Sequence, residues 1–269
     1  LMSGGRLGCV VNPAAGKEQV LSFEPTDTVH KPKKILVVGG GPAGMECARA
    51  AALRGHQVEL CEAMNRLGGQ VLMARAAPKR GDVGAIVDWL AEELDTLGVN
   101  IHLNTYVDEE RVSEIAPDEV VLATGTMPRT DGLQQSMPAS PIPGFDLGHV
   151  FNSWEILGYG DAAQTKGPVL VYDDTGTFEA ISVVEVLLTR GVQVTMVSRH
   201  DSIGARLNYP PVTAGAARER LYASHFDFIG GHYVRSIHPD RVEVGVLFTD
   251  RIRRIPAQTV VMVGYNEAN

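Results

Sequence analysis

Cysteine is scarce in this sequence, and its scarcity bears on where the protein works. The 269 residues contain three cysteines, Cys9, Cys47 and Cys61. Three scattered thiols do not build the disulfide framework of a small secreted domain. We therefore expect a reducing compartment, the cytoplasm. We also expect Cys47, in a helical pattern, and Cys61, in a strand pattern, to be core residues.

Long apolar runs and clusters of basic residues are also missing. No apolar run approaches the roughly 18 residues of a membrane span, so we expect no membrane segment. The formal net charge is −8, with 24 basic against 32 acidic residues and no basic block, which argues against a nucleic-acid partner. The eight histidines show no metal-binding spacing. An acidic chain of ordinary globular composition is compatible with an enzyme that acts on small molecules.

The sequence contains an internal repeat. The stretch from Pro32 to Ala63 aligns without a gap with the stretch from Pro168 to Arg199, at an offset of 136 residues. Each copy has the pattern of an apolar strand, a turn, a helix, a glycine C-cap and a second apolar strand. That pattern is the βαβ unit of a parallel sheet. Two copies predict an α/β protein with two Rossmann-like, doubly wound domains.

The repeat divides the chain into three parts. We expect an N-terminal segment and linker at 1–31, a first nucleotide-binding domain at 32–163, and a second domain at 164–269. The stretch 130–163 is rich in proline, glycine and serine, and we expect it to cross between the domains. The chain opens without an initiator methionine and stops directly after a strand pattern, so we expect a piece of a longer protein.

The first copy carries a complete glycine loop, GGGPAG (Gly39–Gly44), between its first strand and its helix. Gly39 would permit a tight turn, Gly41 would let the backbone approach a pyrophosphate, and Gly44 would let the helix pack closely on the strand. The helix N-terminus offers unpaired N–H groups and a partial positive charge to the phosphates. Glu62 ends the second strand, 23 residues after Gly39, where a carboxylate accepts hydrogen bonds from a ribose. The arrangement favours an adenine nucleotide, and a merely structural turn is the alternative.

The second copy keeps the scaffold and loses the glycine loop. The three fingerprint positions fall on Thr175, Thr177 and Ala180. Threonine at the second position puts a branched side chain where a pyrophosphate needs bare backbone. Asp173 and Asp174 add negative charge near two phosphates, a repulsion of about 1 kcal/mol or more for each close pair. We therefore expect this loop not to bind NAD(P)H.

These motifs resemble the C-terminal half of the trimethylamine dehydrogenase and 2,4-dienoyl-CoA reductase group of flavoproteins. Proteins of that group join an Old-Yellow-Enzyme-type (β/α)8 barrel, which carries FMN and a four-iron–four-sulfur cluster, to two nucleotide-type domains. The resemblance runs from about Cys9 to Val263, and the barrel is not in this chain. The stretches that carry it are CVVNPAAGKE (Cys9–Glu18), KILVVGGGPAGMECA (Lys34–Ala48), LGGQ (Leu67–Gln70), VVLATGT (Val120–Thr126) and, typical of the amine-dehydrogenase branch, TDG (Thr130–Gly132) and PIPG (Pro141–Gly144).

The resemblance implies which residues hold a cofactor. It implies FAD, or ADP as in the amine dehydrogenases, in the first domain. It implies Cys9 as one cysteine ligand of the cluster, with the other three ligands before Leu1. For the stretch from Gly68 to Gln70, a glycine turn before a helix is the alternative. The implied cofactor contacts are Gly39, Gly41, Pro42, Ala43, Gly44, Glu62, Gly68, Gly69, Gln70, Val107 at the end of an expected strand over 99–107, Ala123, Thr124 and Gly125.

The function that the resemblance implies is that of an iron–sulfur flavoprotein oxidoreductase. Its amine dehydrogenase or demethylase branch oxidises a small amine at FMN and passes electrons to an electron-transferring flavoprotein. We also expect a homo-oligomer for the full-length protein. Because substrate oxidation takes place on the barrel, no catalytic residue can be named in this chain.

Two other functions stay open. One is an NADPH-dependent 2,4-dienoyl-CoA (enoate) reductase, in which Arg199 would bind the 2′-phosphate of the cofactor. The other is a non-catalytic module that binds ADP and docks a partner. The group's later Gly-Asp contact to the flavin would fall beyond Asn269, so we expect this chain to hold its cofactor weakly.

Overall fold

The chain folds into two compact units in the computed structural model. The structure describes residues 8–21, 29–158, 163–207 and 212–269. Unit 1 comprises Leu1–Arg75, Arg80–Thr126 and Ala268–Asn269, and unit 2 comprises Ala76–Lys79 and Met127–Glu267. Each unit is built on a parallel sheet with helices packed on it, which confirms the predicted α/β class.

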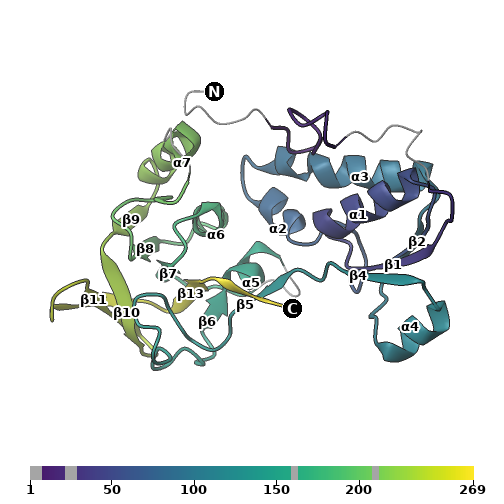
Figure 1. Ribbon diagram of the computed structural model, residues 1–269. Helices are drawn as coiled ribbons and strands as arrows, with labels where there is room; N and C mark the ends of the chain where they lie inside the picture. Colours follow the sequence, from purple (N-terminus) through teal and green to yellow (C-terminus); the bar gives the residue numbers. More distant parts are fainter. Residues whose placement is uncertain (1–7, 22–28, 159–162, 208–211) are drawn as a thin grey trace. The chain divides into compact units, whose positions relative to one another are not determined.

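A four-stranded parallel sheet in the order β3-β2-β1-β4 forms the centre of unit 1 (Figure 1). Its strands are β1 (Lys34–Val38), β2 (Gln57–Cys61), β3 (Asn100–His102) and β4 (Glu119–Leu122). The helical segments of the unit are α1 (Pro42–Leu53), α2 (Val71–Ala76), the 3-10 turn η2 (Gly81–Gly84), α3 (Ala85–Thr96) and α4 (Glu109–Ile115). Helices α1 and α3 lie side by side on one face of the sheet, over a core that includes Leu60 and Leu90. The short helix α4 packs on the other face, against Leu36.

Unit 2 is centred on a five-stranded parallel sheet in the order β6-β13-β7-β8-β9. Its strands are β6 (Val150–Asn152), β7 (Val169–Asp173), β8 (Val194–Ser198), β9 (Phe226–Ile229) and β13 (Thr259–Val263), and its helices are α5 (Ser153–Leu157), α6 (Phe178–Thr189) and α7 (Val212–Tyr222). All five residues of β7 are buried, as expected for a central parallel strand that is covered on both faces. One cover is an antiparallel sheet that packs on Tyr172 through Val234 and Val244. Its strands are β10 (His232–Ile237), β11 (Arg241–Val246) and β12 (Ile252–Pro256), and a separate two-stranded sheet is formed by β5 (Thr126–Pro128) and β14 (Asn266–Ala268).

The helices are those of a globular α/β protein. Helices α1, α3 and α6 have 12 residues each. Within the described ranges, no helix has the length and the apolar character that crossing a membrane requires.

The strand expected over 99–107 is shorter than its sequence pattern. It ends at His102, because the chain turns at Asn104, where φ is +52°. The N–H groups of Asn104 and Thr105 donate to the carbonyls of Met64 and Glu62 instead of extending the sheet. The prediction was therefore wrong beyond His102.

The main part of unit 2 begins at Met127, whereas the sequence placed the domain boundary after Ala163. The stretch 130–163 contains β6, which pairs in parallel with β13. It also supplies Ile142, which is 1% exposed in the core of unit 2. Because β6 has three residues in a proline- and glycine-rich stretch, no apolar pattern reveals it. The crossover interpretation is corrected accordingly for the described part of this stretch, residues 130–158 and 163, which packs as part of unit 2.

A buried arginine joins α1 to α3. Arg49, which is 7% exposed, donates from Nε to Glu46 Oε2 at 2.8 Å. Its Nη1 lies 3.5 Å from Glu93 Oε2 on α3. Its guanidinium carbon lies 5.0 Å from the centre of the Trp89 ring, also on α3. The side chain therefore stabilises the packing of the two helices through both charge and cation–π contact.

We expect Arg49→Ala to lower the free energy of unfolding by about 2 kcal/mol, because packing and cation–π contact are lost and two half-buried carboxylates lose their counter-charge. Urea denaturation followed by circular dichroism measures the change. Lys33→Ala is the matched control in unit 1. This substitution breaks the ion pair between Lys33 and Glu119, whose side chains are 50% and 57% exposed, respectively. Because so exposed a pair contributes little, the urea midpoint should stay unchanged. An equal loss in both variants would contradict this account of Arg49.

Candidate nucleotide-binding site

Gly39 and Gly44 are glycines because the protein itself occupies the space beside them. Gly39 has a φ of +110°, and a Cβ there would lie 2.3 Å from the carbonyl oxygen of Ala123. A Cβ on Gly44 would lie 1.9 Å from the carbonyl oxygen of Gly39. The end of β4 and the first turn of α1 therefore pack directly on the loop. This is the close helix–strand packing expected of such a loop.

Gly41 is different, because nothing in the protein requires a glycine there. Its φ of −76° and ψ of 175° are an extended conformation that any residue adopts. The nearest heavy atom to a Cβ would be the Cα of Gly69, at 4.0 Å. Gly41 is the N-cap of α1, and this N-terminus has neither a side-chain cap nor an acidic residue in its first turn. Bare space before an uncapped helix N-terminus fits the phosphates of a nucleotide.

Backbone donors hold Glu62 beside the loop. Its Oε2 accepts from the N–H of Gly40 at 2.6 Å, and its Oε1 accepts from the N–H of Met64 at 2.7 Å. The residue is 9% exposed. Because each carboxylate oxygen has a second lone pair, the fixed carboxylate keeps acceptor capacity for a ribose hydroxyl.

Two further predicted segments meet the glycine loop. A Cβ on Gly69 would lie 3.1 Å from the Cα of Gly41, so the two bare backbones face each other. Gln70 donates from Nε2 to the hydroxyl of Thr126 at 2.8 Å, and Gly125, with a φ of +75°, lies beside Gln70. The structure thus brings the glycine loop, the stretch 68–70 and the stretch 123–125 together at one edge of the sheet.

The remaining predicted contacts lie around this edge. Pro42 is the first residue of α1, where a missing N–H costs nothing, and Ala43 beside it is exposed. The hydroxyl of Thr124 donates to the carbonyl of Asn269 at 2.8 Å. Val107 packs against the cluster of Leu36, Cys61 and Ile115. Contact of these residues with a cofactor stays a prediction.

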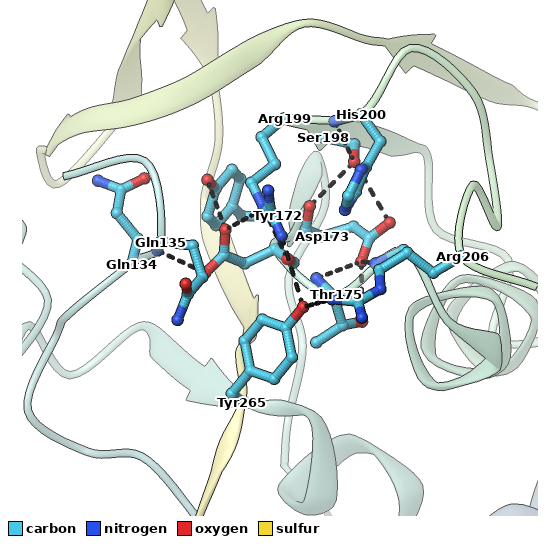
Figure 2. A network of polar contacts seen from close by, with 12 residues as sticks. Gln134, Gln135, Tyr172, Asp173, Thr175, Ser198, Arg199, His200, Arg206 and Tyr265 are labelled. Carbon is cyan, nitrogen blue, oxygen red and sulfur yellow. Dashed lines mark hydrogen bonds and ion pairs between the residues drawn. The ribbon is translucent and has the colours of Figure 1, made fainter. Parts of the chain in front are cut away.

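In unit 2 the corresponding loop is filled by its own side chains (Figure 2). Asp173 is fully buried, and its Oδ1 accepts from the N–H and hydroxyl of Thr175, both at 3.0 Å, and from the N–H of Gly176 at 2.7 Å. The hydroxyl of Ser198 lies 3.3 Å from its Oδ2. The carboxylate therefore occupies the loop N–H groups that would otherwise face a phosphate. The sequence indicated the repulsion by Asp173 but not this internal capping.

The backbone at Thr177 is extended, like that at Gly41, but the Thr177 side chain fills the space that is bare at Gly41. Thr177 is the N-cap of α6, with a φ of −113° and a ψ of −177°. Its hydroxyl lies 2.9 Å from the hydroxyl of Thr175. Glu179 lies in the first turn of α6. Burial raises the pKa of its carboxyl, and the hydrogen bond from the Ser153 hydroxyl lowers that pKa in part. Both side chains add bulk or acidity where a pyrophosphate would bind.

Arg199, the residue considered for a 2′-phosphate, is already engaged. Its Nε lies 3.0 Å from Asp174 Oδ1 and donates to the Asp174 carbonyl at 2.9 Å. Burial raises the pKa of the Asp174 carboxyl, and the Gln135 N–H and the charge of Arg199 act in the opposite direction. The hydroxyl of Tyr265 accepts from both Arg199 and Arg206 (Figure 2). Sequence reasoning did not identify Tyr265 or Arg206 as part of this site. Tyr265 follows β13 and Arg206 lies between β8 and α7, so neither belongs to a loop motif.

Cys9 is exposed, and hydrogen bonds from the backbone of Asn12 and Val11 lower the pKa of its thiol. A lowered pKa suits a metal-binding thiolate. Across the described ranges, no group of three or more Cys, His, Asp or Glu side chains could hold a metal ion. Ligation of an iron–sulfur cluster by Cys9 therefore stays a prediction.

Unit 1 presents an open glycine loop, and unit 2 presents the same scaffold with the loop filled by its own side chains. Two such units define a dinucleotide-binding protein of the two-domain FAD/NAD(P) type. The chain belongs to the pyridine nucleotide-disulphide oxidoreductase family, whose model matches residues 33–268. Its relatives place it in the trimethylamine dehydrogenase and 2,4-dienoyl-CoA reductase group, on the amine-dehydrogenase side.

Three relatives illustrate this. The "Probable N-methylproline demethylase" of Rhizobium meliloti is 35% identical over 198 residues, which are 74% of this chain and 27% of that protein. The N,N-dimethylglycine/sarcosine dehydrogenase of Chromohalobacter salexigens is 36% identical over 202 residues, 73% of this chain and 28% of that protein. The solved 6-hydroxypseudooxynicotine amine oxidase of Pseudomonas geniculata N1 has a TM-score of 0.90 and 30% identity, over 99% of this chain and 40% of its own. Other matched relatives are named reductases, one of them a reductase and demethylase. The chain spans less than a third of the curated relatives' length.

Proposed function

We propose that this chain is the nucleotide-binding part of a flavin-dependent oxidoreductase of the amine dehydrogenase or demethylase type, with FAD or ADP held in unit 1. The space at Gly41 carries the proposal, because neither the backbone conformation nor packing explains a glycine at that position. The names of the relatives support the amine dehydrogenase or demethylase type.

Each residue of the site has a defined part in this proposal. The backbone N–H groups at the N-terminus of α1 would bind the pyrophosphate, and the bare backbones of Gly41 and Gly69 would let it approach. Glu62 would accept hydrogen bonds from a ribose. FAD, when bound, supplies two-electron chemistry through its flavin ring.

Electrons in this proposal leave the protein for an electron-transferring flavoprotein and do not enter from NAD(P)H. The closed loop of unit 2 supports this direction, since Asp173 holds the N–H groups of Thr175 and Gly176. FMN, the four-iron–four-sulfur cluster with Cys9 as one ligand, and the site for a small amine belong in this proposal to the full-length protein. We propose a cytoplasmic homo-oligomer for that protein.

Mass spectrometry of the nucleotide released on denaturation tests the first part. We expect the purified chain to carry little cofactor, so it is first incubated with an equimolar mixture of FAD and ADP and then freed of unbound nucleotide. Release of FAD that bleaches on reduction supports the oxidoreductase, and release of ADP alone supports an ADP site like that of the amine dehydrogenases or a docking module. Release of neither nucleotide, from a chain shown to be folded, would contradict the site.

An NADPH-dependent reductase is the second candidate, favoured by the relatives that are named reductases. It would need Arg199 and the loop N–H groups for the cofactor, and both are engaged within unit 2. We therefore expect calorimetric titration with NADH and with NADPH to show no binding in the low micromolar range. Titration with FAD in the same buffer is the positive control. A low micromolar Kd for either reduced nucleotide would move the protein to the reductase branch.

A further inference from the structure

Unit 2 contains a cavity of about 260 Å³ at the carboxyl ends of three parallel strands. Asn152 ends β6, Asp174 follows β7 and Gly264 follows β13, and all three residues line the cavity. In the order β6-β13-β7-β8-β9, β13 lies between β6 and β7, although β6 and β7 follow each other in the chain. Open α/β sheets bind their ligands outside the carboxyl ends of their strands.

The walls of this cavity combine aromatic rings with acidic side chains. Phe145 and Phe151, both partly exposed, supply the rings, and Asp146 and Glu155 supply carboxylates. Rings present a negative face to a cation, and a carboxylate in the same space adds to that attraction. The same walls repel phosphate groups.

The charges that line the cavity do not cancel. Among the described residues of the lining, Arg129 is the one with a basic side chain, and its guanidinium is shared between Asp131 and Glu267. Asp174, also in the lining, is balanced by Arg199.

The two remaining carboxylates of the lining have no basic partner among the described residues. Glu155 accepts the N–H of Asn152 at 2.7 Å in the capping box of α5, and within the described residues no basic side chain pairs with it or with Asp146. The cavity is therefore acidic.

We propose that this cavity binds a small organic cation of the alkylammonium class. The rings and the unbalanced carboxylates favour a positively charged, partly apolar ligand over a neutral one of equal shape. The volume lies just below the roughly 300–1,000 Å³ of pockets for drug-sized ligands, which limits the ligand to a few heavy atoms beyond the charged group. The proposal is one of binding and not of chemistry, and it does not depend on the flavin site proposed for unit 1.

Titration of the 269-residue chain with tetramethylammonium chloride tests the proposal. This probe carries a permanent charge and has no N–H, so neither its protonation nor its oxidation complicates the measurement. tert-Butanol has a similar shape without the charge and is the matched control ligand. With ionic strength held constant by sodium chloride, we expect saturable binding of tetramethylammonium in the millimolar range or tighter, at least tenfold tighter than tert-butanol. The readout is ligand-observed NMR.

Three variants place the binding in this cavity. Glu155→Gln removes the charge and keeps an acceptor for the capping box, and Asp146→Asn changes an exposed side chain; together they should weaken binding about tenfold. Phe151→Leu keeps an apolar wall and removes a ring, and should weaken it about threefold. Asp240→Asn, an exposed carboxylate outside the lining, should leave the Kd unchanged. Circular dichroism melting confirms that each variant is folded.

Equal affinity for tetramethylammonium and tert-butanol would overturn the proposal, and so would an unchanged Kd in the folded Glu155→Gln/Asp146→Asn variant. Absence of saturable binding throughout the millimolar range would overturn it as well. These outcomes leave the flavin proposal untouched, because the nucleotide released from unit 1 is measured separately.

Discussion

Gly41→Val should abolish nucleotide binding while leaving the fold intact. Outside its two chain neighbours, the heavy atom nearest to a Cβ at Gly41 is the Cα of Gly69 at 4.0 Å, and the backbone there is extended, so a side chain meets neither a clash at Cβ nor backbone strain. The same side chain fills the space in front of the α1 N-terminus where the pyrophosphate would approach. We expect FAD or ADP to bind more than about a hundredfold more weakly, a loss of about 3 kcal/mol or more. Equilibrium dialysis against radiolabelled nucleotide measures the change.

Thr177→Val is the control for this experiment, because Thr177 occupies the corresponding N-cap of α6 in unit 2. That variant places the same side chain on the same scaffold and should bind nucleotide like the unchanged chain. Wild-type stoichiometry in Gly41→Val, or an equal loss in Thr177→Val, would show that the nucleotide lies elsewhere.

The sequence could predict those elements whose pattern of apolar residues, glycines and caps lies within a short stretch of the chain. Both βαβ units were found because apolar strands and glycine C-caps recur at one offset, and the structure places β1, α1 and β2 and then β7, α6 and β8 accordingly. The position of Glu62 beside the glycine loop followed from the end of a parallel strand. Gly39 and Gly44 behave as their spacing predicts, with φ at Gly39 positive and the helix packed on the loop at Gly44.

The features that local pattern could not predict depend on contacts between distant segments. Gln135 donates its N–H to Asp174 at 2.8 Å across 39 residues, and this contact draws the proline-rich stretch into unit 2. No spacing rule links the two positions. The cavity at the carboxyl ends of the strands likewise gathers side chains from β6, β7 and β13, and their common edge is visible only once the strand order is known. The expectation about Asp173 considered only its charge toward a phosphate, and it did not include the hydrogen bonds that the carboxylate accepts from the N–H groups of Thr175 and Gly176.

Asp173→Ala should destabilise unit 2 strongly. The carboxylate is fully buried and accepts from the N–H groups of Thr175 and Gly176 at 3.0 and 2.7 Å. Alanine leaves both donors buried without an acceptor, and each unsatisfied donor costs about 1–3 kcal/mol. The hydroxyl of Ser198 keeps the Asp173 backbone carbonyl as acceptor, at 3.0 Å, and so limits the loss. We expect the free energy of unfolding to fall by about 3 kcal/mol, measured by guanidinium denaturation with a probe in each unit.

Asp173→Asn separates hydrogen bonding from charge. Its side-chain oxygen still accepts both loop N–H groups, and its amide replaces the oxygen that lies 3.3 Å from Ser198. We expect a loss of about 1 kcal/mol, because the bonds to an ionised acceptor become neutral ones and the geometry is kept. Equal losses in the two variants would show that the negative charge itself, and not acceptance of the loop N–H groups, stabilises the loop. A loss below about 1 kcal/mol in Asp173→Ala would mean that water replaces the carboxylate, and that the closed loop is not held by Asp173.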